Sequence, residues 1–245
     1  MAQYAGRGVH GQTVEVIARR ILSGEIAEGA TLNLAALQEE LDVSLTALRE
    51  ALKVLTAKGI VDARQKRGTF VRPRSDWNLL DGDVIRWQFA DGADPRLLDK
   101  LQEVRAIIEP AAARLAAARA TADDLAVLDA ALHDMADAHA DPGAAVAADL
   151  AFHRALLAAT HNELLVRMEV VMETGLAERD RLVHGHGDGH DDPVPSHRAV
   201  VDAIRGGDEG AAETAMRELL AKAVRDVEKL REQRSPAAAN ERAKR

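Results

Sequence analysis

The feature that most constrains the fold is a helix, turn, helix and hairpin pattern within residues 34–71. Apolar residues recur at positions i, i+3 and i+7 over 34–41, so one face of a two-turn helix is buried. Residues 42–43 leave room only for a turn. Ser44 then suits the N-cap of a second helix over 44–58. The pattern predicts a helix-turn-helix unit followed by a hairpin.

Two short runs after this helix, 60–63 and 69–71, predict the strands of that hairpin. The turn between them concentrates positive charge and ends in a glycine suited to positive φ; it contains Arg64, Lys66, Arg67 and Gly68. A small helical module whose charges are merely solvated is the plain alternative. However, three cations in one tight turn suit contact with phosphates better than packing. The sequence therefore favours a DNA-binding domain with a basic wing.

The second helix divides into a buried and an outward face. Helical spacing buries Ala47, Leu48, Ala51, Leu52 and Leu55. The candidate DNA contacts lie at the helix start, on its outer face and in the wing; they are Ser44, Leu45, Thr46, Arg49, Lys53, Arg64, Lys66, Arg67, Gly68 and Thr69. In a major groove, Thr46 and Arg49 would meet base edges. Leu45 would pack on a thymine methyl group, and Lys53 would reach a phosphate.

These segments resemble the winged helix-turn-helix of the GntR family. The resemblance covers nearly all of residues 10–74, and it is carried by residues 21–26, Gly29, 32–33, 43–52, 58–61 and 68–71. It implies binding to double-stranded operator DNA. The chain departs from the family pattern at Ala35 and Leu45, where members usually carry arginines. Because an arginine fork reads guanine, the family's usual operator sequence is not carried over.

Composition favours helices for the rest of the chain. Aromatic residues make up 2% of the sequence and hydrophobic residues 47%, so the core must consist of Ala, Leu, Val and Ile. Such side chains favour closely packed helices over a β-rich domain. The absence of cysteine excludes disulfides and thiolate chemistry. No run approaches the roughly 18 apolar residues of a membrane span, and a cytoplasmic location is expected.

Charge is divided unevenly along the chain. Residues 1–74 hold 11 Lys and Arg against 8 Asp and Glu, a net charge of +3, whereas the whole chain carries −8. A mildly basic head on an acidic body fits local DNA binding rather than coating of nucleic acid along its length.

The sequence predicts four parts: a winged helix-turn-helix domain over 10–74, a linker with a short helix over 75–94, an all-helical domain over 95–233 and a disordered tail over 234–245. The helices of the third part are joined by short loops, which predicts an α-helical bundle. One helix is expected to run unbroken over 163–183, before a glycine-rich loop whose histidines are expected to be solvated: His184, His186 and His190. The fold class is therefore mainly α with one small β wing.

The helical part resembles the FCD-type effector domain of the FadR subfamily of GntR regulators. The matching stretches are 101–110, 149–153 and 197–204, and the resemblance spans about 95–232. It implies a homodimer that binds a small carboxylate effector. Residues 77–97 further resemble members that respond to sugar acids, which implies a galactonate-like aldonate.

Asp149 and His153 stand four residues apart, so they project from the same face of a helix. A carboxylate and an imidazole suit a divalent metal such as zinc. The resemblance adds His197 to this set, whereas Leu219 stands where the family usually has a further histidine. Three protein ligands would leave room for water or effector oxygens. The alternative is a polar cavity lined by histidines without metal.

Arg105 lies on a helix face otherwise made of apolar residues, where a cation is costly to bury without an anionic partner. The resemblance assigns its guanidinium to the effector carboxylate, and the guanidinium fork suits that role. A salt bridge to Glu109, four residues on, is the other explanation. The two explanations are compatible.

The sequence contains no nucleophile motif or phosphate-binding glycine loop, and no enzyme activity is expected. It predicts a dimeric, ligand-responsive transcription regulator, a repressor of a sugar-acid catabolic pathway. One alternative is a metal-dependent enzyme domain fused to a DNA-binding head. Another is an architectural DNA-binding protein without an effector.

Overall fold

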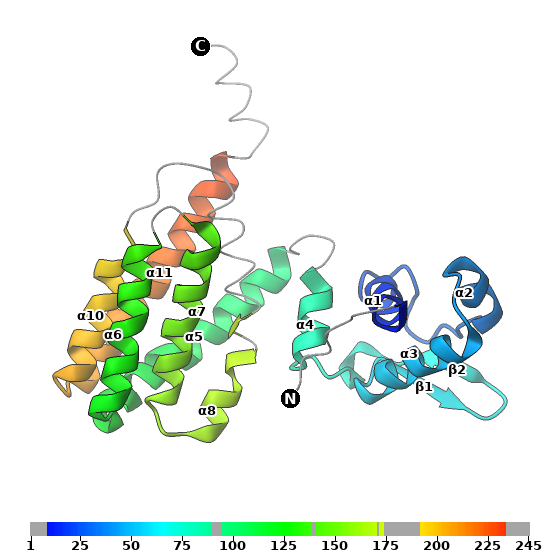
Figure 1. The fold of residues 1–245 in the computed structure, drawn as a ribbon, viewed down its shortest axis with the longest axis horizontal. Helices are drawn as coiled ribbons and strands as arrows, with labels where there is room; N and C mark the ends of the chain where they lie inside the picture. The colour runs from blue at the N-terminus through cyan, green and yellow to red at the C-terminus, as the bar shows by residue number, and fades with distance from the viewer. Residues whose placement is uncertain (1–8, 90–94, 139–140, 171, 174–191, 234–245) are drawn as a thin grey trace, which may run out of the picture. The chain divides into compact units, whose positions relative to one another are not determined.

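The computed structural model divides into two compact units, Met1–Asp94 and Pro95–Arg245. The structure describes residues 9–89, 95–138, 141–170, 172–173 and 192–233. Helices make up most of both units, and the sheet within the described residues is one antiparallel hairpin (Figure 1). The predicted fold class, mainly α with a small β wing, is confirmed.

The first unit contains, in chain order, α1 (Val9–Leu22), α2 (Leu34–Glu40), α3 (Leu45–Ala57), β1 (Val61–Arg64), β2 (Gly68–Val71), the 3-10 helix η1 (Arg74–Asp76) and α4 (Gly82–Phe89). The strands pair antiparallel, with Val61 opposite Val71. Thr31 forms a further antiparallel bridge to Phe70, so the segment before α2 borders the hairpin. This arrangement is a winged helix-turn-helix.

Side-chain caps set the starts of α2 and α3. The Asn33 side chain accepts a hydrogen bond from Ala36 N, and the Ser44 hydroxyl accepts one from Ala47 N, each at 3.1 Å. Such caps satisfy N–H groups that the first helical turn leaves without partners. Ser44 is therefore the N-cap that the sequence indicates, and Asn33 is a cap that the sequence pattern did not reveal.

The wing strands differ by one residue from their predicted bounds, because the first lies one residue later and the second begins one residue earlier. The strands cover 61–64 and 68–71, so the turn has three residues. Both Lys66 and Gly68 adopt left-handed φ angles, 69° and 81°. The sequence indicated this backbone only for Gly68, because left-handed φ is uncommon for a residue with a Cβ atom.

Gly59 ends α3 for a steric reason. Its φ of 75° is left-handed, and a Cβ atom there would lie 2.5 Å from the carbonyl oxygen of Asp76. Asn78 N also donates to the carbonyl of Lys58 at 3.0 Å. The segment after the hairpin therefore folds back on the end of α3.

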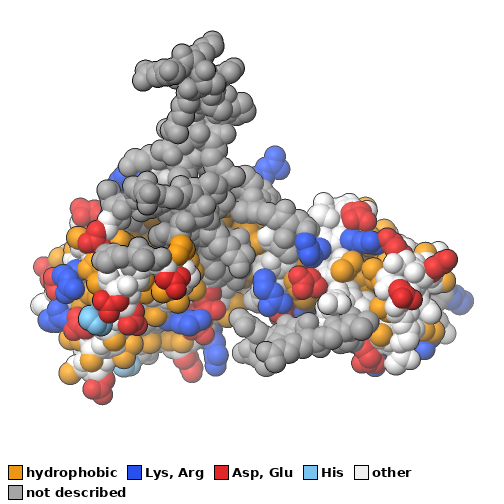
Figure 2. Space-filling model, turned by 45° about the horizontal axis from the view of Figure 1, so that its top comes forward, with side chains coloured by type: hydrophobic (Ala, Val, Ile, Leu, Met, Phe, Trp, Pro, Cys, Tyr) orange, Lys and Arg blue, Asp and Glu red, His pale blue; other side chains and the backbone are white. Residues whose placement is uncertain are grey.

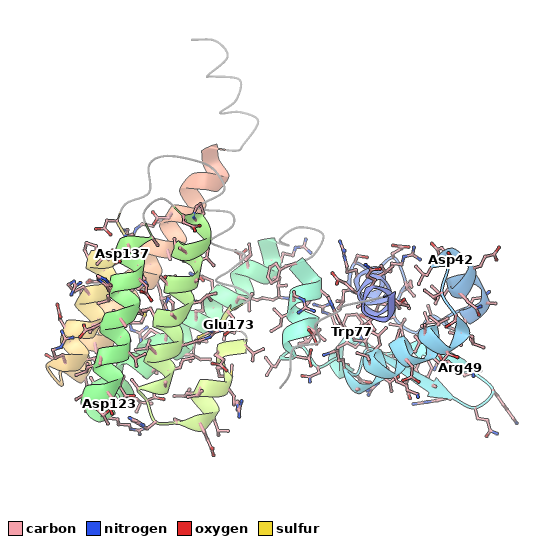
Figure 3. The ribbon with its side chains drawn as sticks, in the orientation of Figure 1. Asp42, Arg49, Trp77, Asp123, Asp137 and Glu173 are labelled. Atoms are coloured by element: carbon pink, nitrogen blue, oxygen red, sulfur yellow. The ribbon has the colours of Figure 1, made fainter. Side chains whose placement is uncertain are left out.

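The core of the first unit includes residues that the sequence assigns to a linker. Trp77, labelled in Figure 3, and Trp87 are 7% and 2% exposed. They belong to one apolar cluster whose members include Val14, Ile17, Leu48, Leu55, Ile60 and Val71. Residues 75–89 thus contribute to the core of the DNA-binding unit.

The second unit is a helical bundle of α5 (Pro95–Arg119), α6 (Ala122–Asp137), α7 (Pro142–Ala158), α8 (Glu163–Arg167), α10 (Val194–Arg205) and α11 (Glu209–Gln233). Helix α5 packs against α7, α10 and α11, and α6 packs against α7 and α10 (Figure 1). Asp123 and Asp137, labelled in Figure 3, lie near the two ends of α6. The core is rich in alanine and leucine around Phe152, as the scarcity of aromatic residues requires.

The prediction of one unbroken helix over 163–183 is wrong, because the structure interrupts it at residue 168. Helix α8 ends at Arg167, where Met168 N donates to Leu165 O at 2.9 Å and closes a tight turn, and helical structure resumes at residue 169. The predicted histidine loop, up to His190, and the tail 234–245 lie outside the described residues. No helix in the described ranges is long and apolar enough to cross a membrane.

Candidate functional site

Two regions contain the candidate residues: the outer face of the winged helix-turn-helix and a buried centre in the helical bundle. Figure 2 shows acidic and basic side chains interspersed over the visible surface of both units. The DNA contacts are therefore examined residue by residue.

Helix α3 exposes the residues that the sequence predicts for base contact. Leu45 is 38% exposed, and Thr46 and Arg49 are also exposed (Figure 3 labels Arg49). Lys53 Nζ donates to Glu50 Oε1 at 2.7 Å, and both side chains of this pair are exposed. The Ser44 hydroxyl is engaged as the N-cap, so this residue positions the helix.

The wing cations differ in their surroundings. The Arg67 guanidinium stacks on the Phe70 ring, 3.7 Å from its centroid, and its Nη2 donates to Gly29 O at 3.0 Å. Arg64 lies 5.4 Å from the same ring. Lys66 is exposed at the tip of the turn. Arg67 therefore also stabilises the wing, a role that the sequence did not reveal.

The remaining wing residues of the predicted set lie in β2. Gly68 is exposed and Thr69 is half-buried, and the carbonyl of Thr69 accepts a 2.8 Å hydrogen bond from Leu32 N. Both residues follow the tip directly, at the base of the turn that carries the cations.

The buried centre of the bundle gathers charged and polar side chains from three helices. Helix α5 supplies two of them, α7 two and α10 one, and each is at most 7% exposed: Arg105, Glu109, Asp149, His153 and His197. The structure thus brings together all five residues that the sequence assigns to effector and metal.

Arg105 is held by Glu109, as the salt-bridge explanation predicts. Arg105 Nε donates to Glu109 Oε1 at 2.6 Å, and Arg105 Nη2 lies 3.4 Å from Glu109 Oε2. His153 Nδ1 lies 2.9 Å from Glu109 Oε2, although not in line for a hydrogen bond. Glu109 therefore contacts both the cation of α5 and the imidazole of α7.

The charge state of Glu109 follows from these contacts. Complete burial would raise the pKa of its carboxyl group, but the adjacent Arg105 guanidinium opposes that effect, and the pKa is lowered to about 2. The carboxylate is therefore ionised and balances the buried guanidinium.

His197 presents its Nε2 atom to the centre. Its Nδ1 lies 2.8 Å from the carbonyl oxygen of Pro193, which can only accept a hydrogen bond, so Nδ1 carries the proton. Its Nε2 lies 3.1 Å from Asp149 Oδ1 without hydrogen-bond geometry. The ring is also held edge-on by Phe152 at 4.7 Å between centroids. In the neutral ring, the lone pair of Nε2 would face a carboxylate oxygen in a buried position, an arrangement that a cation would stabilise.

Asp149, His153 and His197 fit a metal ion. Their ligand atoms lie within 4.8 Å of one another, and all three residues are buried. A backbone carbonyl orienting one imidazole and a carboxylate beside the other are the usual surroundings of metal-binding histidines. Leu219 is buried in the apolar cluster of the bundle, so its position supplies no ligand.

Two contacts in this centre escaped the sequence analysis. The approach of Glu109 to His153 joins residues 44 positions apart, and the role of the Pro193 carbonyl depends on how α10 begins. A local signal in the sequence is the pair of prolines, Pro193 and Pro195, because proline is common in the first turn of a helix, here before His197.

A winged helix-turn-helix joined in one chain to a helical bundle with a buried polar centre defines a transcription regulator with a sensor domain. Residues 10–71 match the family described as bacterial regulatory proteins, gntR family, and residues 100–222 match the FCD domain. The chain belongs to the GntR family and has an FCD domain.

Similar proteins agree with this assignment. The galactonate operon transcriptional repressor of Escherichia coli is 35% identical over 219 residues, which cover 89% of this chain and 96% of the relative. The HTH-type transcriptional regulator LutR of Bacillus subtilis is 31% identical, with 80% and 90% covered. The solved structure of Lar, described as controlling the Listeria monocytogenes agr system, has a TM-score of 0.59 at 16% identity, covers 91% and 98%, and supports the fold alone.

Family membership settles the general class of activity. GntR proteins with an FCD domain bind operator DNA and small molecules and are not enzymes, so the enzyme alternative is set aside. FCD domains can bind metal ions, which agrees with the chemistry of the Asp149, His153 and His197 cluster.

Proposed function

We propose that this protein represses a sugar-acid catabolic operon and leaves its operator when a galactonate-like carboxylate binds the bundle. The observation that carries the proposal is the buried centre, in which one arginine and three metal-type ligands converge. The similarity to a galactonate operon repressor supports both the sign of regulation and the class of effector.

The DNA-binding part of the proposal assigns α3 to the major groove. Thr46 and Arg49 read base edges, and Leu45 contacts a thymine methyl group. Lys53 and the wing cations bind phosphates, with Lys66 as the most accessible member of the wing. Two such domains in a homodimer would read a symmetric operator.

In the sensor part, Asp149, His153 and His197 would hold a divalent metal, zinc or an ion of similar preference. When bound, the ion would supply open coordination positions for oxygen ligands. Arg105 contributes the remaining positive charge, and its N–H groups suit a carboxylate. Since Glu109 already occupies one edge of the guanidinium, the effector would use the other donors of the fork.

Release of DNA requires that the effector prefer one state of the dimer. An effector shifts the equilibrium between DNA-binding and released states only by its difference in affinity for them. An architectural DNA-binding protein needs no such centre, and the burial of five polar groups at one place favours a sensor.

The test is fluorescence anisotropy of labelled operator DNA against rising galactonate, gluconate and glucuronate. Wild-type protein should be released by at least one sugar acid. Arg105→Ala should need much more effector, because a charge-assisted hydrogen bond contributes about 1.5–3 kcal/mol. Arg114→Ala is the matched control, since Arg114 lies on the same helix in an exposed pair with Glu209. If Arg105→Ala responds like this control, the effector role of Arg105 is wrong.

A further inference from the structure

Arg105 contacts the nitrogen atom of His153 through which this histidine would bind a metal ion. Arg105 Nη2 lies 3.2 Å from His153 Nε2, in a buried contact. A guanidinium can only donate hydrogen bonds, so His153 Nε2 is the acceptor and carries no proton. The proton of the neutral ring is then on Nδ1, which faces Glu109 at 2.9 Å. The lone pair of Nε2 is therefore the coordinating position of this histidine.

A lone pair cannot serve a guanidinium and a metal ion at the same time. His153 Nε2 also lies 3.8 Å from Asp149 Oδ1, which in turn lies 3.1 Å from His197 Nε2. We propose that Arg105 is a resident cation that competes with the metal for His153, so that metal binding displaces its guanidinium from the imidazole. This inference rests on the proposed metal site.

The charges of the centre support this exchange. Glu109 and Asp149 bring two carboxylates into a region that is nearly closed to solvent, and Arg105 is the permanent cation among the five residues. A divalent ion entering beside the guanidinium meets like charge as well as an occupied ligand, and both effects weaken metal binding. Glu109 remains as an anchor for Arg105 after the contact with His153 is lost.

Displacement also links the metal to the anionic effector. A guanidinium that has left His153 has an N–H group without an acceptor in a buried place, where an unpaired donor is costly. A carboxylate that accepts this N–H group stabilises the displaced arginine. By reciprocity of binding free energies, the carboxylate must then tighten metal binding by the same factor as metal tightens carboxylate binding.

The test measures zinc affinity of the full-length protein by competition with a chromophoric chelator, without effector. Arg105→Gln removes the charge and should bind zinc at least about tenfold more tightly than wild type. Arg114→Gln, on the exposed face of the same helix, should match wild type. Equal or weaker zinc binding by a folded Arg105→Gln would overturn the competition. If wild-type protein binds no more zinc than His197→Ala does, the metal site itself is refuted.

A second measurement covers the case in which Arg105→Gln does not fold. A crystal structure of zinc-loaded wild-type protein should place Arg105 Nη2 beyond hydrogen-bonding distance of His153 Nε2, with zinc on that nitrogen. Zinc bound to Asp149 and His197 while Arg105 keeps its contact with His153 would refute the inference and leave the metal site standing.

Discussion

Lys58, which follows the last turn of α3, donates a 2.6 Å hydrogen bond from Nζ to Oδ1 of Asp81, directly before α4. The same ammonium group lies 2.8 Å from Asp83 Oδ2, and the three side chains are at most 13% exposed. Asp81 Oδ1 also accepts from the backbone N–H groups of Asp83 and Val84, so it caps α4. Lys58 thus links the start of α4 to the end of α3, the helix proposed to read DNA.

Loss of the Lys58 contacts should destabilise the DNA-binding unit. Lys58→Met leaves the largely buried Asp81 carboxylate without its cation and leaves Asp83 with Arg86 alone. Breaking a buried pair from one side costs up to about 3–5 kcal/mol. Thermal unfolding should show a clearly lower midpoint. Lys53→Met is the control, because the exposed pair with Glu50 contributes about 0–1 kcal/mol. Equal midpoints for the two variants would mean that the Lys58 contacts do not hold α4.

The DNA contacts predict two different kinds of loss. Arg49→Ala should weaken binding to the operator by about 1–3 kcal/mol with little effect on random DNA, because it removes a base contact. Lys66→Ala should weaken binding to all sequences and lower the salt slope by about one unit. Anisotropy titrations at several salt concentrations separate these effects. A uniform loss for Arg49→Ala would exclude base reading by this residue.

Local patterns explain why part of this structure was predictable. Ser44 and the apolar spacing of Leu48 and Leu55 define α3, because capping and helical periodicity depend on residues within a few positions. Asp149 and His153 could be paired for the same reason, as they lie one turn apart on α7.

Contacts between distant residues were not predictable in this way. Lys58 resembles an ordinary surface lysine before a helix-ending glycine, and nothing near it in sequence indicates Asp81 as its partner. The stacking of Arg67 on Phe70 required the strand register, which the sequence placed one residue away at β1. The position of His197 beside Asp149 came from family resemblance, since single-sequence periodicity does not say which helices are neighbours.

A capping box on α6 predicts a pH effect. Hydrogen bonds from the backbone N–H and the hydroxyl of Thr121, opposed by burial and aided by His161, lower the pKa of Asp124. Its stabilising effect is therefore present above the unfolded pKa, near 4, and is lost as pH falls through the lower folded pKa. Asp124→Asn should cost about 1 kcal/mol near neutral pH, and the difference from wild type should shrink below about pH 4. A difference that stays constant down to pH 2 would contradict this assignment.

Metal removal gives the last prediction. A ligand that binds only the folded state stabilises it, by about 2.7 kcal/mol when its free concentration is 100 times the dissociation constant. Zinc should therefore raise the unfolding midpoint of wild-type protein, and a chelator should reverse the change. His197→Ala removes one of three ligands and should lose the response. His133→Ala is the matched control, because His133 is an exposed histidine of α6 that pairs with Asp137.

Elemental analysis should find about one ion per chain in wild type and in His133→Ala, as expected when three protein ligands hold one ion. If zinc shifts His197→Ala as much as the control, the ion binds elsewhere and the buried centre is a polar cluster without metal.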